Sequence, residues 1–185
     1  MSPKNLSNNK TLICTRNPFD VHDSWWSFHA RVPENGTEIY EAQLERDEFI
    51  KMVRENEHVY GPWVEWHNSW AQEVSTNKNV YVYHYEDLVS NPEDTILKIA
   101  EFLEISVSQE HMGKILKIIK LDTMKGIENA GKDDDSAKVR NGKIGASLKN
   151  LSKLTIENLK SDLYRVDPVF GHVEIAKKYL KDLDF

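Results

Sequence analysis

Two separate stretches of the chain combine arginine with residues suited to hold a phosphate or another oxyanion. Arg16 follows a short apolar run, and Ser24 lies eight residues further on. Arg140, Asn141 and Gly142 form the second stretch, with lysines on both sides. A guanidinium offers a forked set of donors, and glycine lets backbone N–H groups approach an oxyanion closely. These residue types predict an anion site if the fold brings the two stretches together.

The first stretch reads as a strand, a turn and a helix. Residues 11–15 are apolar or β-branched, which is typical of a strand covered on both faces. Pro18 begins a helix well, and Asp20 lies where an N-cap or a first-turn acid is favoured. Apolar residues then recur at helical spacing: Val21, Trp25 and Phe28. Arg16 therefore leaves the carboxyl end of a strand, where ligands dock in open α/β sheets.

The remaining elements are predicted from apolar spacing and from their caps. Residues 80–85 predict a second strand. Helices are expected over 46–56, from 63 to 74, after Asn91-Pro92, after Ser108, and in two pieces after residue 153. The tryptophan stripe of the second of these helices, at 63, 66 and 70, is expected to be core rather than a substrate wall.

Composition narrows the class of protein. The 185 residues are 39% hydrophobic and 29% charged, which fits one globular domain or a large part of one. The net charge of −6 argues against a general nucleic-acid binder but leaves an anionic nucleotide open. Cys14 is the single cysteine, so an intrachain disulfide is excluded, and it is expected to be a small core residue. No signal peptide or membrane span is visible, so the predicted location is cytoplasmic. No metal site is expected.

Three runs of the chain resemble the cytosolic sulfotransferases, which use 3'-phosphoadenosine 5'-phosphosulfate, PAPS. The first is Arg-Asn-Pro-Phe-Asp-Val at 16–21 followed by Ser24. The resemblance implies that Arg16 and Ser24 hold the 3'-phosphate of the cofactor. The second is Tyr-Glu-Asp at 85–87, before Asn91-Pro92, and it implies that Tyr85 meets the adenine end.

The third run, Val-Arg-Asn-Gly-Lys-Ile-Gly at 139–145, is similar to the family's Arg-Lys-Gly-x-x-Gly loop. The resemblance implies that Arg140, the adjoining backbone of Asn141, and Gly142 grip the 3'-phosphate. Asn141 stands where the family has lysine, so one positive charge is missing. Residues 126–150 are accordingly expected to form a mobile cofactor-binding loop. The family's aromatic contact to adenine has no counterpart at 119–121.

The resemblance also implies a fold. We expect an α/β, P-loop-NTPase-like sulfotransferase fold, with a small parallel sheet flanked by helices, in a single partial domain over 1–185. The family's phosphosulfate loop and general-base histidine have no counterpart, so the domain is expected to be amino-terminally truncated. Histidines such as His22, His29 and His84 are expected in packing or at the surface, and no catalytic residue is assigned.

The implied function is transfer of a sulfuryl group from PAPS to a hydroxyl or amine of a small molecule. This chain is expected to keep the 3'-phosphate half of the cofactor site and to be inactive alone, with a homodimer or a missing amino-terminal half as partner. The alternative is a non-catalytic remnant that binds adenosine 3',5'-bisphosphate or acts as an interaction module. An unrelated all-helical module is a third interpretation, which the two predicted strands disfavour.

Overall fold

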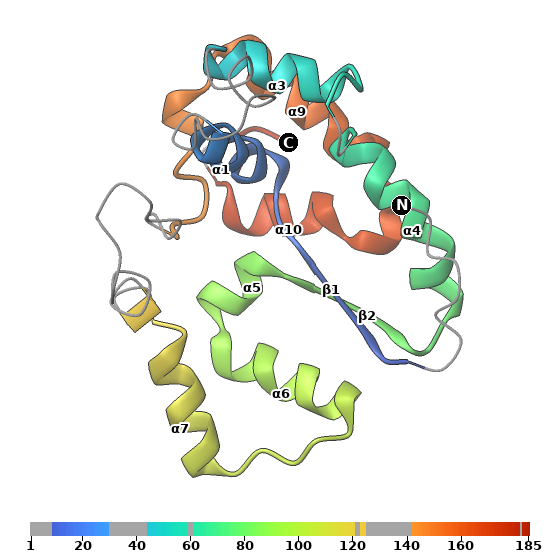
Figure 1. Cartoon of the computed structure of the whole chain (residues 1–185), viewed down its shortest axis with the longest axis vertical. Helices are drawn as coiled ribbons and strands as arrows, with labels where there is room; N and C mark the ends of the chain where they lie inside the picture. Colours follow the sequence, from blue (N-terminus) through green and yellow to red (C-terminus); the bar gives the residue numbers. More distant parts are fainter. Residues whose placement is uncertain (1–8, 30–43, 59–60, 121–122, 125–141, 182) are drawn as a thin grey trace.

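The computed structural model describes residues 9–29, 44–58, 61–120, 123–124, 142–181 and 183–185 of the chain. Within these residues, strands β1 (Thr11–Thr15) and β2 (Val80–His84) form a parallel pair flanked by helices (Figure 1). Thr11 lies opposite Val80, and Thr15 lies opposite His84. The predicted α/β class and the small parallel sheet are confirmed.

The chain turns sharply between β1 and helix α1 (Pro18–His29). Asn17 caps this helix, because its side-chain oxygen accepts a hydrogen bond of 2.9 Å from the backbone N–H of Asp20. Pro18 then occupies the first helical position, where a missing N–H costs nothing. Asp20 is therefore a first-turn acid and not the cap, and its carboxylate stays available for other partners.

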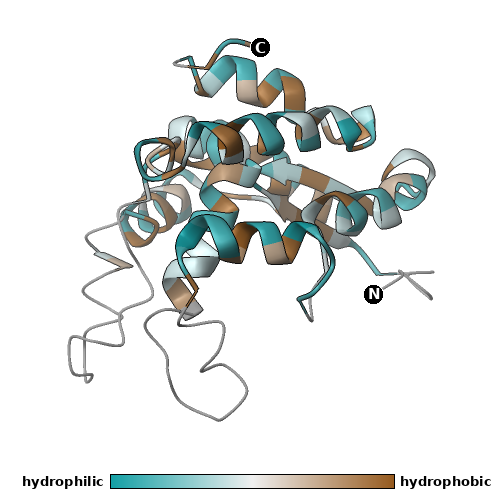
Figure 2. Ribbon diagram, turned by 90° about the horizontal axis from the view of Figure 1, so that it is seen from above, coloured by the Kyte–Doolittle hydropathy of each residue, from teal (hydrophilic) through white to brown (hydrophobic). Residues whose placement is uncertain are grey.

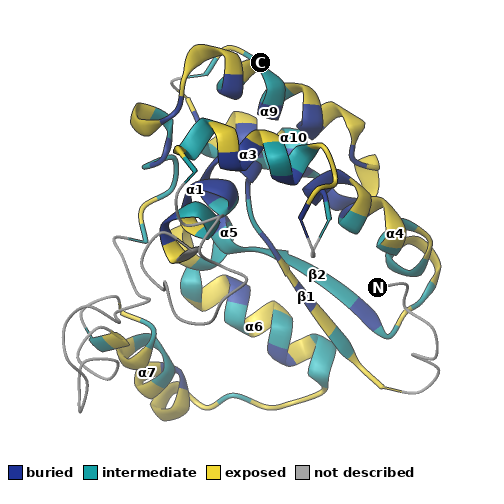
Figure 3. Ribbon diagram, turned by 45° about the horizontal axis from the view of Figure 1, so that its top comes forward, coloured by how far each residue is buried: buried dark blue, intermediate teal, exposed yellow. Residues whose placement is uncertain are grey.

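The outer part of β1 corrects one sequence prediction. Ile13 and Thr15 are buried, whereas Leu12 is 38% exposed and Cys14 is exposed as well. The expectation of a strand covered on both faces, with Cys14 as a core residue, is wrong for the described part of the chain. The helix on this side, α6 (Pro92–Leu103), packs against β2, where Phe102 stacks on Tyr81 at 5.3 Å, and it leaves Leu12 and Cys14 exposed (Figure 3).

The main core lies on the other face of the sheet. Helices α3 (Arg46–Arg54), α4 (Trp63–Thr76) and α9 (Lys153–Arg165) pack with α1, and their apolar sides face inward (Figure 2). Side chains in this core that have 2% exposure or less include Phe19, Phe49, Leu159, Leu163 and Phe170. Trp63 is buried in this core and Trp70 packs against it, so the predicted core role is confirmed for these two residues of the stripe, whereas Trp66 is half-buried.

Three further helices follow β2, and in Figure 1 the first lies beside the carboxyl end of the sheet and the other two lie below it. They are α5 (Tyr85–Ser90), α6 and α7 (Gln109–Ile118). The predicted cap of α7 is confirmed, because the Ser108 hydroxyl accepts from the backbone N–H of His111 at 3.2 Å. The second strand ends one residue earlier than predicted, because Tyr85 begins α5 directly after His84.

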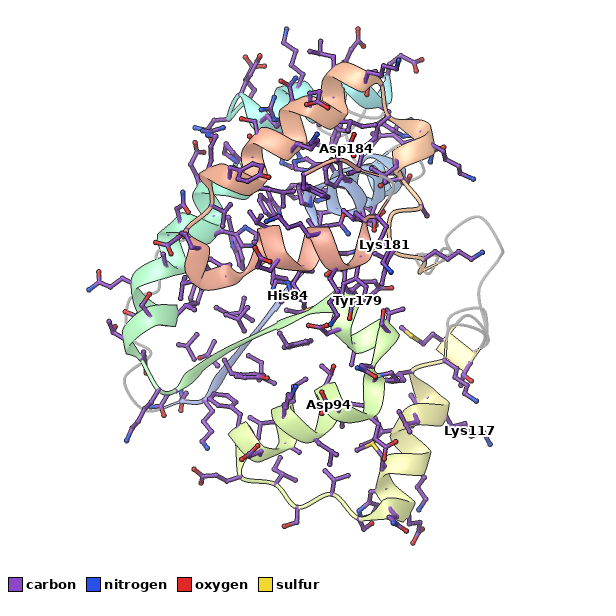
Figure 4. All side chains as sticks on the ribbon, turned by 180° about the vertical axis from the view of Figure 1, so that it is seen from behind. His84, Asp94, Lys117, Tyr179, Lys181 and Asp184 are labelled. Atoms are coloured by element: carbon purple, nitrogen blue, oxygen red, sulfur yellow. The ribbon has the colours of Figure 1, made fainter. Side chains whose placement is uncertain are left out.

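The short helix α10 (His172–Tyr179) crosses the carboxyl end of the sheet, after the turn η3 (Pro168–Phe170). The Tyr179 hydroxyl donates to Asp87 at 2.6 Å, and Lys178 donates to the same carboxylate at 2.8 Å. Burial acts to raise the pKa of Asp87, but these two hydrogen bonds outweigh it and the pKa lies below its ordinary value. Figure 4 shows Tyr179 and His84 between α10 and the end of β2.

Candidate functional site

A cavity of about 700 Å³ opens where the strands end and brings together four of the six predicted site residues. Arg16 and Ser24 line it from the first stretch, Tyr85 from the start of α5, and Gly142 from the second stretch. Arg140 and Asn141 lie outside the described residues, so their place in this site stays a prediction. Residues far apart in the sequence therefore meet at the carboxyl edge of the sheet, where α/β ligands bind.

Arg16 is held in place by two neighbours and keeps a donor unused. Its guanidinium lies 4.2 Å from the ring centre of Tyr85, and one of its terminal nitrogens lies 3.3 Å from Asp20. Its buried Nε has no hydrogen-bond partner among the described residues. A buried donor without a partner is costly, and the Arg16 side chain lines the cavity, so this guanidinium is a candidate to donate to an acceptor of a ligand.

Tyr85 links the end of β2 to the glycine-containing turn. Its hydroxyl donates to the backbone carbonyl of Gly142 at 3.1 Å. Gly142 has φ +61° and Gly145 has φ +71°, a backbone region that disfavours side chains. A Cβ on Gly145 would lie 3.0 Å from Leu180, so this turn needs glycine both for its backbone and for its packing.

Asp20, from the first stretch, forms hydrogen bonds with the turn that follows the second stretch. It is 3% exposed, and its oxygens accept from Gly145 N–H at 2.8 Å, from the Ser147 hydroxyl at 2.7 Å and from Asn17 Nδ2 at 2.9 Å. It therefore positions the turn against Arg16. Sequence reasoning gave Asp20 only a local role, because nothing in local spacing indicates partners about 125 residues away.

Glu86 fixes the hinge that carries Arg16. It is fully buried, and its Oε1 accepts from the backbone N–H of Asn17 at 2.8 Å and from Asn17 Nδ2 at 2.6 Å. Because Glu86 follows Tyr85, the same short segment orients both the aromatic ring and the strand end. The sequence indicates Glu86 only as the middle residue of the Tyr-Glu-Asp motif, and it carries no local signal for the pairing with Asn17.

A cluster of histidines packs around the buried Thr15 at the end of β1, and His67 and His172 are not among the residues that line the cavity. His67 Nε2 and His172 Nε2 contact the Thr15 hydroxyl at 2.7 and 3.0 Å, and His67 Nδ1 donates to the Trp63 carbonyl at 2.7 Å. His67 therefore accepts from Thr15, and His172 donates to it. Burial lowers the pKa of His67 to about 4 and also lowers that of His172, so both rings are neutral at pH 7.

Two other histidines match the predicted packing role. His22 is buried and contacts the Pro18 carbonyl at 2.6 Å, while His84 contacts the Phe170 carbonyl at 2.7 Å. The side chain of His29 lies outside the described residues. Among the residues that the structure places, no group of acids, cysteines and histidines is arranged to hold a metal ion. Within the same residues, no helix combines the length and apolarity needed to span a membrane.

Comparison with known proteins identifies the class. A model of the sulfotransferase domain matches residues 1–163, so the chain belongs to the sulfotransferase family, as its motifs predicted. Sulfotransferase 1 family member D1 of Mus musculus is 31% identical over 119 residues, which are 63% of this chain and 37% of the relative. Cytosolic sulfotransferase 13 of Arabidopsis thaliana is 26% identical over 162 residues, which are 81% and 49% of the two chains.

Solved structures support the same fold. Mouse sulfotransferase SULT7A1, complexed with PAP, superposes with a TM-score of 0.78 at 21% identity, covering 95% of this chain and 64% of that chain. Retinol dehydratase in a complex with retinol and PAP gives a TM-score of 0.66 at 21% identity, covering 95% and 49%. The predicted sulfotransferase fold is confirmed. The chain spans less than half the length of the curated relatives that it matches.

Proposed function

We propose that this chain binds the 3'-phosphate half of PAPS, and equally adenosine 3',5'-bisphosphate, in the cavity at the ends of β1 and β2. The observation that carries this proposal is the meeting of Arg16, Ser24, Tyr85 and Gly142 around one hollow. The partnerless Nε of Arg16 supplies a donor for a phosphate oxygen. The SULT7A1 and retinol dehydratase structures, which hold PAP, support the choice of nucleotide.

In this assignment Arg16 and Ser24 bind the 3'-phosphate, and the turn from Gly142 to Ser147 closes over it. Asp20 holds that turn in place and limits the side-chain freedom of Arg16. Arg140 and the backbone of Asn141 add the remaining donors, as the resemblance implies. Two lysines, Lys120 and Lys143, also line the cavity and raise the local positive potential for an anionic ligand.

The proposed reaction of the whole protein is sulfuryl transfer from PAPS. The bond between sulfur and the phosphate oxygen breaks, a bond forms between sulfur and the acceptor oxygen or nitrogen, and the acceptor proton passes to a base. We assign no such base among the described residues, because the neutral cluster around Thr15 does not line the cavity. In this proposal, as the resemblance implies, the chain alone binds nucleotide without turnover, and another segment or a partner chain supplies the sulfuryl half of the site.

The acceptor in this proposal is a small-molecule hydroxyl or amine. Relatives named amine sulfotransferase in Oryctolagus cuniculus and 3-alpha-hydroxysteroid sulfotransferase in Cavia porcellus support this class. A cytoplasmic location is proposed on the match to proteins named cytosolic sulfotransferases. A homodimer or an amino-terminal half supplied separately is the proposed partner.

Binding is tested by melting the chain with and without adenosine 3',5'-bisphosphate. A ligand that binds only the folded form raises the melting temperature, and a concentration about 100 times Kd adds about 2.7 kcal/mol of stability. Arg16→Ala is expected to remove the shift, while Lys98→Ala, at an exposed lysine of α6, keeps it. The absence of any shift with the wild-type chain at about 1 mM ligand would contradict the proposal.

Turnover is tested separately with labelled PAPS and a panel of phenols, steroids and amines. We expect no labelled product from this chain alone, even where calorimetry shows nucleotide binding. Product formed by the purified chain would overturn the assignment of the sulfuryl half to another segment, while leaving the nucleotide site intact.

A further inference from the structure

The polar residues that line the cavity come mainly from α1 and the turn after Gly142, and the apolar ones from α5 to α7 and Met124; because α1 and α7 lie apart (Figure 1), the cavity has two unlike ends. The polar end contains Arg16, Asp20, Ser24 and Ser147. The other end is lined by aliphatic and thioether side chains: Leu88, Val89, Pro92, Leu116, Ile119 and Met124. A ligand that fills both ends therefore has an anionic group at one end and an apolar or flat body at the other.

The apolar end is lined mainly by residues of α5 and by residues at the end of α7, with Pro92 and Met124 in addition. On α5, Leu88 and Val89 follow Tyr85 by three and four residues, so they continue the same side of the helix. Leu116 and Ile119 are three residues apart and share one face at the end of α7. The two stripes line the apolar part of the cavity, here called the slot, and offer apolar surface to the faces of a planar group.

Among the described residues, the slot offers few hydrogen-bonding side chains to the edge of a base. Lys120 is the one residue with a polar side chain among the described residues at this end, and it is exposed. The Tyr85 hydroxyl, at the border of the two ends, already donates its proton to Gly142. A site that hydrogen-bonds a substrate can reject analogues by about 10⁴-fold or more, whereas apolar contacts discriminate by about 10- to 200-fold per methylene.

We propose that this cavity selects its nucleotide by the 3'-phosphate and holds the base only by its faces, so that guanine or hypoxanthine is accepted in place of adenine. This inference rests on the proposed function and narrows it. The substrate class becomes 3'-phosphorylated purine nucleosides rather than adenosine alone. Affinity then follows the contact area of the base and not its pattern of donors and acceptors.

Calorimetry of the whole chain with four nucleoside 3',5'-bisphosphates and with adenosine 5'-monophosphate tests this inference. Adenosine, guanosine and inosine bisphosphates are expected to bind within about threefold of each other. Uridine bisphosphate is expected to bind about fivefold more weakly, because a smaller ring buries less apolar surface. Adenosine 5'-monophosphate, which lacks the 3'-phosphate, is expected to bind at least about thirtyfold more weakly.

The possible results distinguish a failure of this inference from a failure of the proposed function. If adenosine bisphosphate binds about tenfold or more tightly than guanosine and inosine bisphosphates, edge recognition operates and the inference is overturned while the nucleotide site stands. If none of the bisphosphates binds at about 1 mM, the proposed function itself fails, and the inference fails with it.

A matched pair of variants on α7 provides a second measurement. Leu116→Ala removes apolar contact from the slot, so the affinity for all three purine bisphosphates is expected to fall by about fivefold with their ratios unchanged. Ile118→Ala, at a neighbour that is 54% exposed and does not line the cavity, is expected to change none of them. A loss confined to the adenosine compound would contradict recognition by the faces of the base.

Discussion

The hydroxyl of Ser147 donates to the carboxylate of Asp20 at 2.7 Å, across 127 residues of sequence. Asp20 also accepts from the backbone N–H of Gly145, and a terminal nitrogen of the Arg16 guanidinium lies 3.3 Å from its carboxylate. One buried carboxylate thus fixes the turn after Gly142 and the arginine at the end of β1 in a single arrangement. The shape of the cavity depends on this contact before any ligand enters.

Replacing Ser147 by alanine is expected to weaken nucleotide binding without removing the Arg16 charge. The variant loses a buried hydrogen bond to a carboxylate, which costs about 1.5–3 kcal/mol of stability. We expect the affinity for adenosine 3',5'-bisphosphate to fall about fivefold to tenfold, because the turn must be ordered when the ligand binds. Calorimetry gives the affinity, and Ser161→Ala, at an exposed serine of α9, is the matched control.

The Arg16 site is expected to need a forked donor and not only a positive charge. Arg16→Lys keeps the charge but loses the planar fork and the stacking on Tyr85, so binding is expected to weaken about tenfold. Arg16→Ala is expected to weaken it about a hundredfold. Equal affinities for the lysine variant and the wild type would show that Arg16 acts only through its charge.

The buried histidines predict a loss of stability in mild acid. Burial lowers the pKa of His22 to about 4 and that of His67 to about 4, from 6.5 in the unfolded chain. Their contribution is therefore complete above about pH 6.5 and is lost as the pH falls toward 4, because the unfolded chain takes up protons first. Each group adds a slope of up to about 1.4 kcal/mol per pH unit.

Urea denaturation between pH 7.5 and pH 4.5 measures this effect, because the range starts above the unfolded pKa of 6.5 and ends just above the folded pKa of about 4. His67→Gln is expected to reduce the slope, whereas His111→Gln, at an exposed histidine of α7, is expected to leave it unchanged. A stability that stays flat over this range would contradict the neutral, buried state of these rings.

The contact between Tyr179 and Asp87 is expected to contribute to the docking of α10. Tyr179→Phe removes a 2.6 Å hydrogen bond to a carboxylate and is expected to cost about 1–2 kcal/mol. For a chain of this size, that loss lowers the melting temperature by about 2–8 °C. Tyr164→Phe, at a tyrosine of α9 that is 57% exposed, is the control and is expected to melt with the wild type.

Much of the framework was predictable, because each element carries a local signal. The apolar runs predicted β1 and β2, Pro18 and Asn91-Pro92 predicted helix starts, and Ser108 predicted a cap. The motif residues Arg16, Ser24, Tyr85 and Gly142 do line one cavity. These predictions succeed because periodicity, proline and capping act over a few residues.

The supporting contacts could not be predicted, because they join distant segments. The pairing of Glu86 with Asn17, and of Asp20 with Ser147, leaves no trace in local spacing. The exposure of Cys14 was predicted wrongly for a related reason. The sequence of an apolar strand does not show which of its residues a neighbouring helix will cover. Here α6 packs against Tyr81 of β2 and leaves Cys14 exposed.

The Thr15 hydroxyl has a single proton, so the relay through it has one polarity: from His172 to Thr15, from Thr15 to His67, and from His67 to the Trp63 carbonyl. Thr15, immediately before Arg16, is thereby held to α10 through His172 and to α4 through His67, by hydrogen bonds whose direction is fixed. Serine could carry the same relay, but valine would leave two imidazoles facing each other without a mediator. The position of Arg16, which directly follows this strand, thus depends on hydrogen bonds between neutral side chains that hold Thr15.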